Sequence, residues 1–291
     1  MTDAARAVSQ MMAEAHISLY ASLPLCECQA DAGRLARLCP DFQPESALFF
    51  LVPYYAGEGV NLSAYAVAED YHLLMDALNE RFCRRLSQIF PGYRFKGFAD
   101  RSPLDERQGA ARAGLGLFGR HRLLIAPAYA SYVFIGEVLS DLPASDFGCL
   151  QVREAEPCRG CGACEAACPT GFLRGEGHPC LSAVTQKKGV LTEQEQAWLR
   201  QGGSAWGCDI CQQVCPHTTE AKEQGSLQTP LLFFHQNRIP TLSRALLHTM
   251  SPQDFARRAY AWRGRDCVQR NMVYLEGEGE PIEPTFDRPP V

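Results

Sequence analysis

The stretch "CRGCGACEAACPTG", residues 158–171, places four cysteines in one short run, and "CDICQQVCP" at 208–216 adds three more. A four-iron four-sulfur cluster is held by four thiolates, and the spacing C-x-x-C-x-x-C lets one loop supply three of them. Cys158, Cys161 and Cys164 have this spacing. The first run therefore predicts an iron–sulfur cluster.

The remaining cysteines of the two runs predict a second cluster. In two-cluster ferredoxins, the cysteine that follows such a run and precedes a proline ligates the other cluster. Cys168 and Cys215 each precede a proline, and Cys180 lies between the runs. The predicted ligands are Cys158, Cys161, Cys164 and Cys215 for cluster one, and Cys168, Cys180, Cys208 and Cys211 for cluster two. Two clusters in one small module would conduct single electrons.

Zinc sites are the alternative, because they also use C-x-x-C units. Three cysteines at this close spacing, with a further cysteine before proline, are more typical of iron–sulfur proteins. Disulfides fit less well, since the chain has 14 cysteines but no export signal, and half of them lie in two short runs.

The composition is that of a soluble globular protein, with 291 residues, 46% of them hydrophobic, and a net charge of -5. This charge excludes a globally basic surface for nucleic acid, so any RNA contact must be local. The N-terminus lacks the pattern of a signal peptide, and the apolar stretch "SALFFLVPYYA" is too short to span a bilayer. We expect a cytoplasmic protein with no membrane partner.

Helices and strands alternate before the cysteine runs. Apolar periodicity predicts a helix within residues 68–90, and a continuous apolar run predicts a buried strand at 47–55. The other predicted elements are helices at 3–15 and 105–116 and strands at 93–100, 122–127 and 131–139. We expect an α+β protein with a layered α/β domain at 1–147, a two-cluster ferredoxin-like module at 148–222 and a helical appendage and tail at 223–291.

The cysteine-rich stretch has short loops and little periodicity, so cofactors are expected to replace part of its core. Beyond it, residues 242–264 look helical, and the tail from 276 to 291 looks loose or wrapped across a surface. No G-x-G-x-x-G follows a strand, so nothing predicts a nicotinamide site.

Several motifs together resemble the epoxyqueuosine reductases, cobalamin-dependent iron–sulfur enzymes that complete queuosine in tRNA. The resemblance runs from about residue 68 to residue 218, with a weaker echo at 263–271. The motifs that carry it are "DRSPLDER", "RAGLGLFGR", "PAYASYVFIGEVLSD", the cysteine run ending in "CPTG", "CLSAVT" and "GCDICQQVCP".

This resemblance implies a cobalamin-binding domain of the nitroreductase and reductive-dehalogenase type, followed by the two-cluster module. The clusters would reduce base-off cobalamin, which drives removal of the epoxide oxygen, and a low-potential donor of the ferredoxin or flavodoxin type would supply electrons. The family's acid is the aspartate that opens "D-x-x-P-x-x-E-R", here Asp100. The implied cobalamin contacts are Asp100, Gly114, Gly116, Gly119, Arg120, His121, Tyr129 and Ser131.

The residues themselves support part of this assignment. Reductive cleavage of a C–O bond leaves an oxygen that must be protonated, and a carboxylic acid whose pKa is raised by a poorly solvated pocket can do so. Asp100 would suit that role, although it could instead cap a helix or pair with Arg101 or Arg107. The glycines would let backbone approach a flat ring, or serve ordinary turns. We interpret His72 as structural.

The chain departs from the family pattern at "GRHR" (119–122), "PAYAS" (127–131) and "CPHT" (215–218), which lie at the expected corrin pocket or its rim. It also lacks the helical repeats with which many members continue, so a tRNA partner is less strongly indicated than the clusters. Arg257, Arg258, Arg263 and Arg265 could meet phosphates or form a solvated helix face. Two alternatives remain open: a corrinoid iron–sulfur reductase with another substrate, and a ferredoxin-type electron-transfer protein.

Overall fold

The computed structural model describes residues 2–276, which form two compact units that are each discontinuous in sequence. Unit 1 contains residues 2–55, 71–162 and 215–232, and unit 2 contains 56–70, 163–214 and 233–276. The domains predicted from the sequence, 1–147, 148–222 and 223–291, are functional modules. A division into compact units does not test them, so they stay a prediction. The predicted tail at 276–291 lies outside the described residues except for Glu276.

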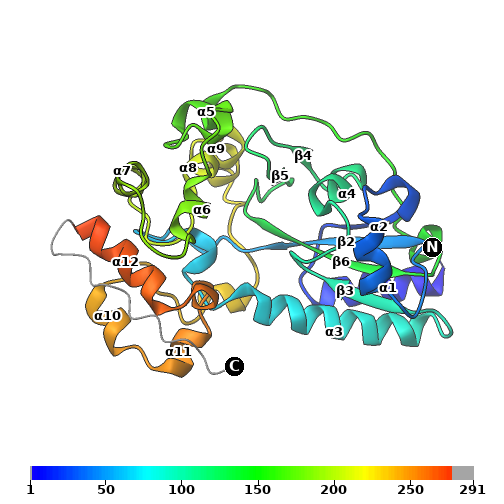
Figure 1. Ribbon diagram of the computed structural model, residues 1–291. Coiled ribbons are helices and arrows are strands. Elements are labelled where there is room, and N and C mark those ends of the chain that lie inside the picture. Colours follow the sequence, from blue (N-terminus) through cyan, green and yellow to red (C-terminus); the bar gives the residue numbers. More distant parts are fainter. Residues whose placement is uncertain (1, 277–291) are drawn as a thin grey trace. The chain divides into compact units, whose positions relative to one another are not determined.

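Unit 1 is built around an antiparallel sheet with the strand order β1-β2-β6-β3 (Figure 1). Its strands are β1 (Tyr20–Pro24), β2 (Ser46–Pro53), β3 (Phe95–Phe98) and β6 (Val133–Ser140), and a separate hairpin pairs β4 (Leu117–Phe118) with β5 (Leu124–Ile125). The helices are α1 (Asp3–Glu14), α2 (Ala32–Leu38), α3 (Tyr71–Ile89), α4 (Glu106–Arg112) and α9 (Pro216–Glu223).

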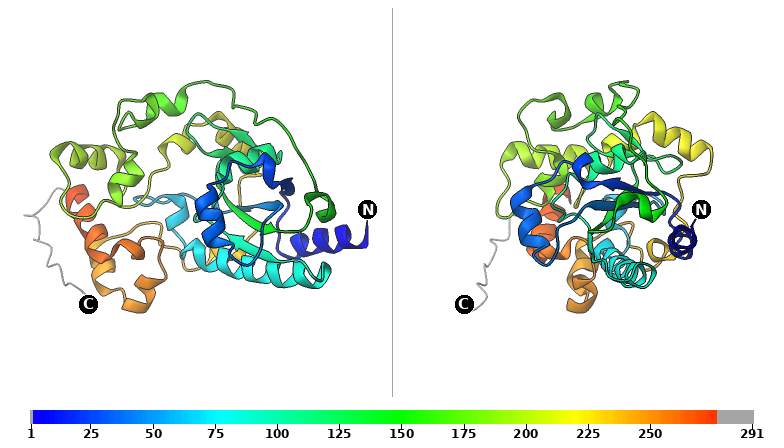
Figure 2. Two further views of the ribbon diagram at one scale, coloured as in Figure 1. Left: turned by 45° about the vertical axis from the view of Figure 1, so that its right-hand side comes forward. Right: turned by 90° about the vertical axis from the view of Figure 1, so that its right-hand side faces the viewer.

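Strand β2 is buried along its whole length because helices cover both faces of the sheet. On one face Phe50 meets Phe82 of α3 edge-on, with ring centroids 5.0 Å apart. On the other, Phe49 belongs to a core that includes Ala110 and Ala111 of α4. The left-hand view of Figure 2 shows α3 extended along its face of the sheet. This layered mixed α/β architecture confirms the predicted fold class.

Unit 2 consists of short helices without a sheet of its own in the described residues. They are α5 (Ala163–Ala167), α6 (Leu181–Thr185), α7 (Glu193–Gly202), α8 (Ile210–Gln213), α10 (Arg244–Thr249), α11 (Pro252–Ala256) and α12 (Arg265–Glu276). Trp206 and Tyr260 are fully buried at its core, together with Val268 and Met272 of α12. The segment after residue 233 therefore shares a core with the cysteine-bearing segment.

Single-turn 3-10 helices complete the described secondary structure. They are η1 (Leu25–Glu27), η2 (Ala64–Ala66), η3 (Ala144–Phe147), η4 (Phe172–Arg174), η5 (Leu232–His235) and η6 (Ala261–Arg263).

The structure differs from the sequence predictions in several elements. Residues 242–264, predicted to be helical, form the separate pieces α10, α11 and η6, because Ser243 and Ser251 each cap a new helix and Pro252 begins one. Strand β1 and helices α2 and α12 were among the elements not predicted; β1 has only five residues and α2 only seven.

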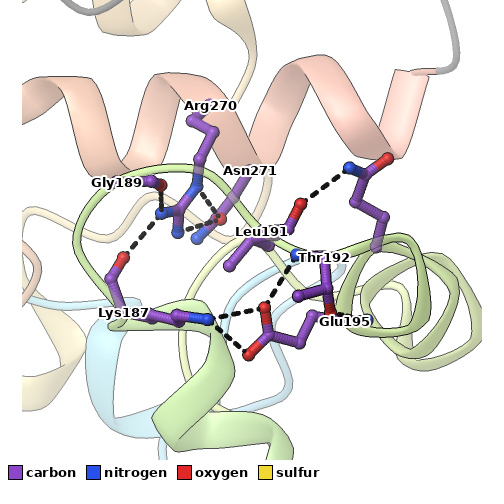
Figure 3. Close-up of polar contacts among 8 residues, drawn as sticks. Lys187, Gly189, Leu191, Thr192, Glu195, Arg270 and Asn271 are labelled. Atoms are coloured by element: carbon purple, nitrogen blue, oxygen red, sulfur yellow. Dashed lines mark hydrogen bonds and ion pairs between the residues drawn. The ribbon is translucent and has the colours of Figure 1, made fainter.

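Helix α12 fixes the loop between α6 and α7, as Figure 3 shows. The Arg270 guanidinium donates hydrogen bonds to the backbone oxygens of Lys187, at 2.6 Å, and Gly189. At the end of this loop Thr192 and Glu195 form a capping box that starts α7, and Lys187 pairs with Glu195 at 2.8 Å. These polar contacts hold the loop between α6 and α7 in place.

Candidate active site and cluster-binding segments

All four ligands predicted for cluster two lie in unit 2. Burial raises the pKa of the Cys208 thiol to about 12, and the nearby Cys180 and Cys168 add to the shift. Burial also raises the pKa of Cys211, with further contributions from Cys208, Cys180 and Cys164. Buried thiols that repel one another as thiolates are stabilised by a cationic metal centre, so the chemistry of this set fits a cluster.

Backbone amides prepare Cys168 as a thiolate. Burial opposes its ionisation, but the N–H groups of Leu173, Thr170 and Phe172 and the Thr170 hydroxyl outweigh burial and lower its pKa. Thr170 Oγ1 lies 3.7 Å from its sulfur. Such groups around a ligand sulfur tune a metal centre after it binds.

The loop with Cys208 and Cys211 is anchored by a carboxylate between them. Asp209 is buried and accepts hydrogen bonds from the Ser63 hydroxyl at 2.5 Å and the Ala64 backbone N–H at 2.6 Å. The Gln212 side chain donates a third at 2.9 Å. These bonds fix the backbone that presents both sulfurs.

Three of the ligands predicted for the other cluster lie in unit 1. Burial raises the pKa of Cys215, the N-cap of α9, and nearby Cys161 and Cys158 contribute to the increase. The Arg120 backbone N–H lies 3.4 Å from Cys158 Sγ. Cys164, the fourth predicted ligand, is in α5 of unit 2. In residues 2–276 no three His, Cys, Asp or Glu side chains form a site for a single metal ion.

Asp100 lies in unit 1 at the end of the β3 region, with its side chain about half exposed (48%). The Tyr71 hydroxyl donates to Asp100 Oδ2, and His72 Nε2 lies 3.3 Å from the same oxygen. Burial opposes ionisation of Asp100, but the bonds from His72 and Tyr71 outweigh it and hold the pKa below its ordinary value. The expected upward shift in this pKa was therefore wrong.

Two of the alternative roles considered for Asp100, capping a helix and pairing with Arg107, are also not what the structure shows, whereas the charge of Arg101 does help to lower its pKa. Asp105, not Asp100, caps α4, with its side chain accepting from the Gln108 backbone N–H at 3.2 Å. Arg107 lies 3.7 Å from Asp105. His72, interpreted as structural, is instead a direct partner of the candidate acid. Tyr71 and His72 are adjacent in the sequence stretch "DYH" (70–72), but only the fold brings these residues of α3 to Asp100, after β3.

The residues predicted to contact cobalamin do not line one common pocket of unit 1. Gly114 and Gly116 line a hollow that combines apolar residues such as Leu117 and Ile125 with the polar or charged residues Arg153, Glu154, Glu156 and His217. Asp100 lines a different pocket, which also contains Arg34, Ser102 and Glu106. Gly119, His121 and Ser131 are buried, Tyr129 is half-buried and Arg120 is exposed.

Protein neighbours by themselves explain two of the three glycines. A Cβ on Gly116 would lie 2.5 Å from the Ile125 backbone oxygen, and one on Gly119 would lie 2.4 Å from the His121 ring. Gly114 has φ +71°, a left-handed conformation that favours glycine in a turn. The apolar part of this hollow offers contact area for one face of a flat macrocycle, while the individual corrin contacts stay a prediction.

In the described part of the chain no helix is both long and apolar enough to cross a membrane.

Comparison with known proteins agrees with the two-cluster interpretation. Residues 157–218 match the family described as a 4Fe-4S double cluster binding domain. The chain is 33% identical over 222 residues to an epoxyqueuosine reductase of Listeria monocytogenes, which covers 71% of this chain but 54% of that protein. This chain thus spans about half the length of the curated relatives that it matches.

Solved structures share the fold. An epoxyqueuosine reductase from Streptococcus thermophilus has a TM-score of 0.72 at 22% identity, with 92% of this chain and 79% of that chain covered. An epoxyqueuosine reductase solved with an epoxyqueuosine-modified tRNA stem loop has a TM-score of 0.71 at 20% identity, covering 94% and 81%.

Proposed function

We propose that this chain, a homologue of the epoxyqueuosine reductases, is an iron–sulfur and cobalamin-dependent oxidoreductase that converts epoxyqueuosine in tRNA to queuosine. The observation that carries the proposal is its 33% identity to a named epoxyqueuosine reductase over 222 residues. The double cluster binding domain at 157–218 supports it, because reductive deoxygenation needs a source of single electrons.

The two groups of cysteines would hold the clusters. We assign Cys168, Cys180, Cys208 and Cys211 to one, and Cys158, Cys161, Cys164 and Cys215 to the other. The buried surroundings of Cys208 and Cys211 would exclude water from the first cluster. A low-potential donor of the ferredoxin or flavodoxin type would supply the electrons.

Cobalamin, when bound, would supply a strongly reducing cobalt centre for the deoxygenation. The protein's own part is to hold the ring, through the apolar part of the hollow beside Gly114 and Gly116, and to manage the proton. Asp100, half exposed and bonded by Tyr71 and His72, would stand where the released oxygen is protonated. Since its pKa lies below the ordinary value, Asp100 must regain a proton before each transfer.

The test is turnover of epoxyqueuosine-containing tRNA by protein loaded with both cofactors and a strong reductant. We expect queuosine to form, and Asp100→Asn to lower kcat by about a hundredfold or more, because a general acid contributes roughly that much. Asp76→Asn, at an exposed position on α3, is the matched control and should keep full activity.

Three outcomes separate this proposal from its alternatives. Cobalamin binding without tRNA binding or turnover would favour a corrinoid reductase with another substrate. Two clusters without any cobalamin absorption would favour an electron-transfer protein. Queuosine formation that does not depend on Asp100 would remove that residue from the mechanism while leaving the activity in place.

A further inference from the structure

Two carboxyl groups lie behind the loop that carries Asp100, and neither has been given a role so far. Glu106 begins α4, and Glu137 lies within β6, where it is 0% exposed. Among the described residues, Glu106 Oε1 and Glu137 Oε2 are buried and have no hydrogen-bond partner. Burying a carboxyl group without full pairing costs free energy, so these two positions call for an explanation.

Burial makes both groups retain their protons to unusually high pH. It raises the pKa of Glu106 to about 7, and the negative charge of Asp100 adds to that shift. It raises the pKa of Glu137 to about 8, with a further contribution from Glu106. Glu106 thus changes charge close to neutral pH, and its charge is coupled to that of Asp100.

Glu137 contacts the Asp100 loop directly, and Glu106 lines the same pocket as Asp100 and Ser102. The backbone N–H groups of Asp100 and Ser102 interact with the Glu106 carboxyl and favour its charged form. The Ser102 hydroxyl donates to Glu137 Oε1 and accepts the Leu104 backbone N–H at 2.8 Å. The loop needs such support, because Asp100 has φ +60°, a left-handed conformation that non-glycine residues rarely adopt.

We propose that Glu106 is the positioning residue for Asp100, and that the Ser102–Glu137 pair is the second anchor of the same loop. This inference rests on the proposed function, in which Asp100 transfers the proton. Ionised Glu106 holds the N–H groups of Asp100 and Ser102 as a charged acceptor, whereas neutral Glu106 holds them more weakly. The placement of Asp100 therefore follows the charge of the carboxyl behind it.

In the described residues, a small set of charged and titratable groups lies around Glu106 and Glu137. Glu106 faces Asp100 and the cation Arg107, and it lies close to Glu137. Glu137 in turn influences the thiols of Cys28 and Cys39, whose pKa values burial raises above the ordinary range. Both thiols stay neutral near pH 7, which leaves the carboxyl groups and His72, 3.3 Å from Asp100 Oδ2, as the ionisable groups of this cluster.

The test measures loop protection and does not depend on turnover. Hydrogen–deuterium exchange of the peptide covering residues 98–105 is followed by mass spectrometry, anaerobically, in the full chain with its clusters loaded. In Glu106→Gln the amides of this peptide should exchange about tenfold faster, since a bond to a charged acceptor is lost. Glu80→Gln, an exposed glutamate on α3, should leave the exchange unchanged.

The pH dependence separates positioning from general stability. After correction for intrinsic exchange, protection of this peptide in the wild-type chain should increase as pH rises through about 7, and Glu106→Gln should abolish that increase. A merely structural role would lower protection equally at every pH. Ser102→Ala, which removes the second anchor, should loosen the same peptide and serves as the test if Glu106→Gln does not fold.

Unchanged protection of residues 98–105 in the folded variant would overturn the inference. In loaded enzyme, Glu106→Gln should reduce kcat with little change in KM, because Glu106 positions the acid and does not bind substrate. A loosened loop in a chain that never forms queuosine would leave the positioning role intact and reject the proposed function. Normal turnover with a pH-independent loop would reject the inference alone.

Discussion

At the scale of single residues, the candidate site is defined by how charge is distributed among carboxyl groups. Asp100 accepts from Tyr71 and His72, so its ionised form is favoured. Glu106 is half-buried and Glu137 fully buried, and in the described residues each has one buried carboxyl oxygen without a hydrogen-bond partner. One loop thus places an acid with a lowered pKa beside two with raised ones. Neighbouring titratable groups whose pKa values are shifted in opposite directions are typical of sites that move protons.

Glu137 should make the stability of the fold depend on pH. Its pKa rises from an ordinary 4.5 to about 8 on folding, so the unfolded chain ionises first and stability falls as pH rises through that window. Glu137→Gln stays neutral and should escape this loss, gaining on the order of a few kcal/mol over the wild type between pH 5.5 and pH 8. Urea unfolding at several pH values measures the difference.

The matched control for this prediction is Glu80→Gln, whose stability relative to the wild type should not vary across the same pH range. A constant offset between Glu137→Gln and the wild type would contradict the prediction, because it would mean that Glu137 ionises equally in both states.

At the scale of elements, the helices of unit 2 depend on polar contacts more than on their own length. Helix α6 has five residues and α8 has four, both too short to be stable alone. Asp209 holds the start of α8, and Arg270 of α12 holds the loop between α6 and α7. The cysteines of this unit are thus presented by elements that other segments keep in place.

Replacing Arg270 should weaken this arrangement. Arg270→Leu removes the bonds to the backbone oxygens of Lys187 and Gly189 (Figure 3), and should lower the free energy of unfolding by about 1.5–3 kcal/mol. Arg200→Leu, at an exposed position in the last turn of α7, should cost less than about 1 kcal/mol. Equal losses in the two variants, measured by chemical unfolding, would speak against the role given to Arg270.

At the scale of the whole molecule, cofactors determine whether the cysteine-rich segment has a core. Burial and the charges of neighbouring cysteines, Cys168 among them, raise the pKa values of Cys180, Cys208 and Cys211, and a cluster relieves that cost. Each unit contributes some of the predicted ligands. Cluster loading and folding should therefore be linked.

Cys180 provides the most selective test, because it lies outside both cysteine runs. Cys180→Ser should lower the content from about eight iron atoms per chain to about four, since one cluster of four irons loses a ligand. Cys83→Ser, on α3, removes a thiol to which no ligand role is assigned, and should retain the full content. Iron and sulfide analysis of anaerobically reconstituted protein measures both, and full content in Cys180→Ser would assign the ligand elsewhere.

The sequence by itself determined the periodic elements and the chemistry of the cysteines. The apolar face of α3 and the continuous apolar run of β2 are local patterns, and C-x-x-C-x-x-C encodes ligand spacing within one loop. Local patterns failed where short segments are stabilised by distant partners, as for β1, α12 and the interrupted helices after residue 242.

Only the tertiary structure decided how Asp100 ionises. Tyr71 and His72 lie in α3, Glu106 in α4 and Glu137 in β6, and the fold brings all of them to the loop after β3. A pKa depends on burial and on charges a few ångströms away, which neither composition nor spacing records. The sequence could therefore nominate an aspartate as the acid, while the environment that lowers its pKa arises from packing.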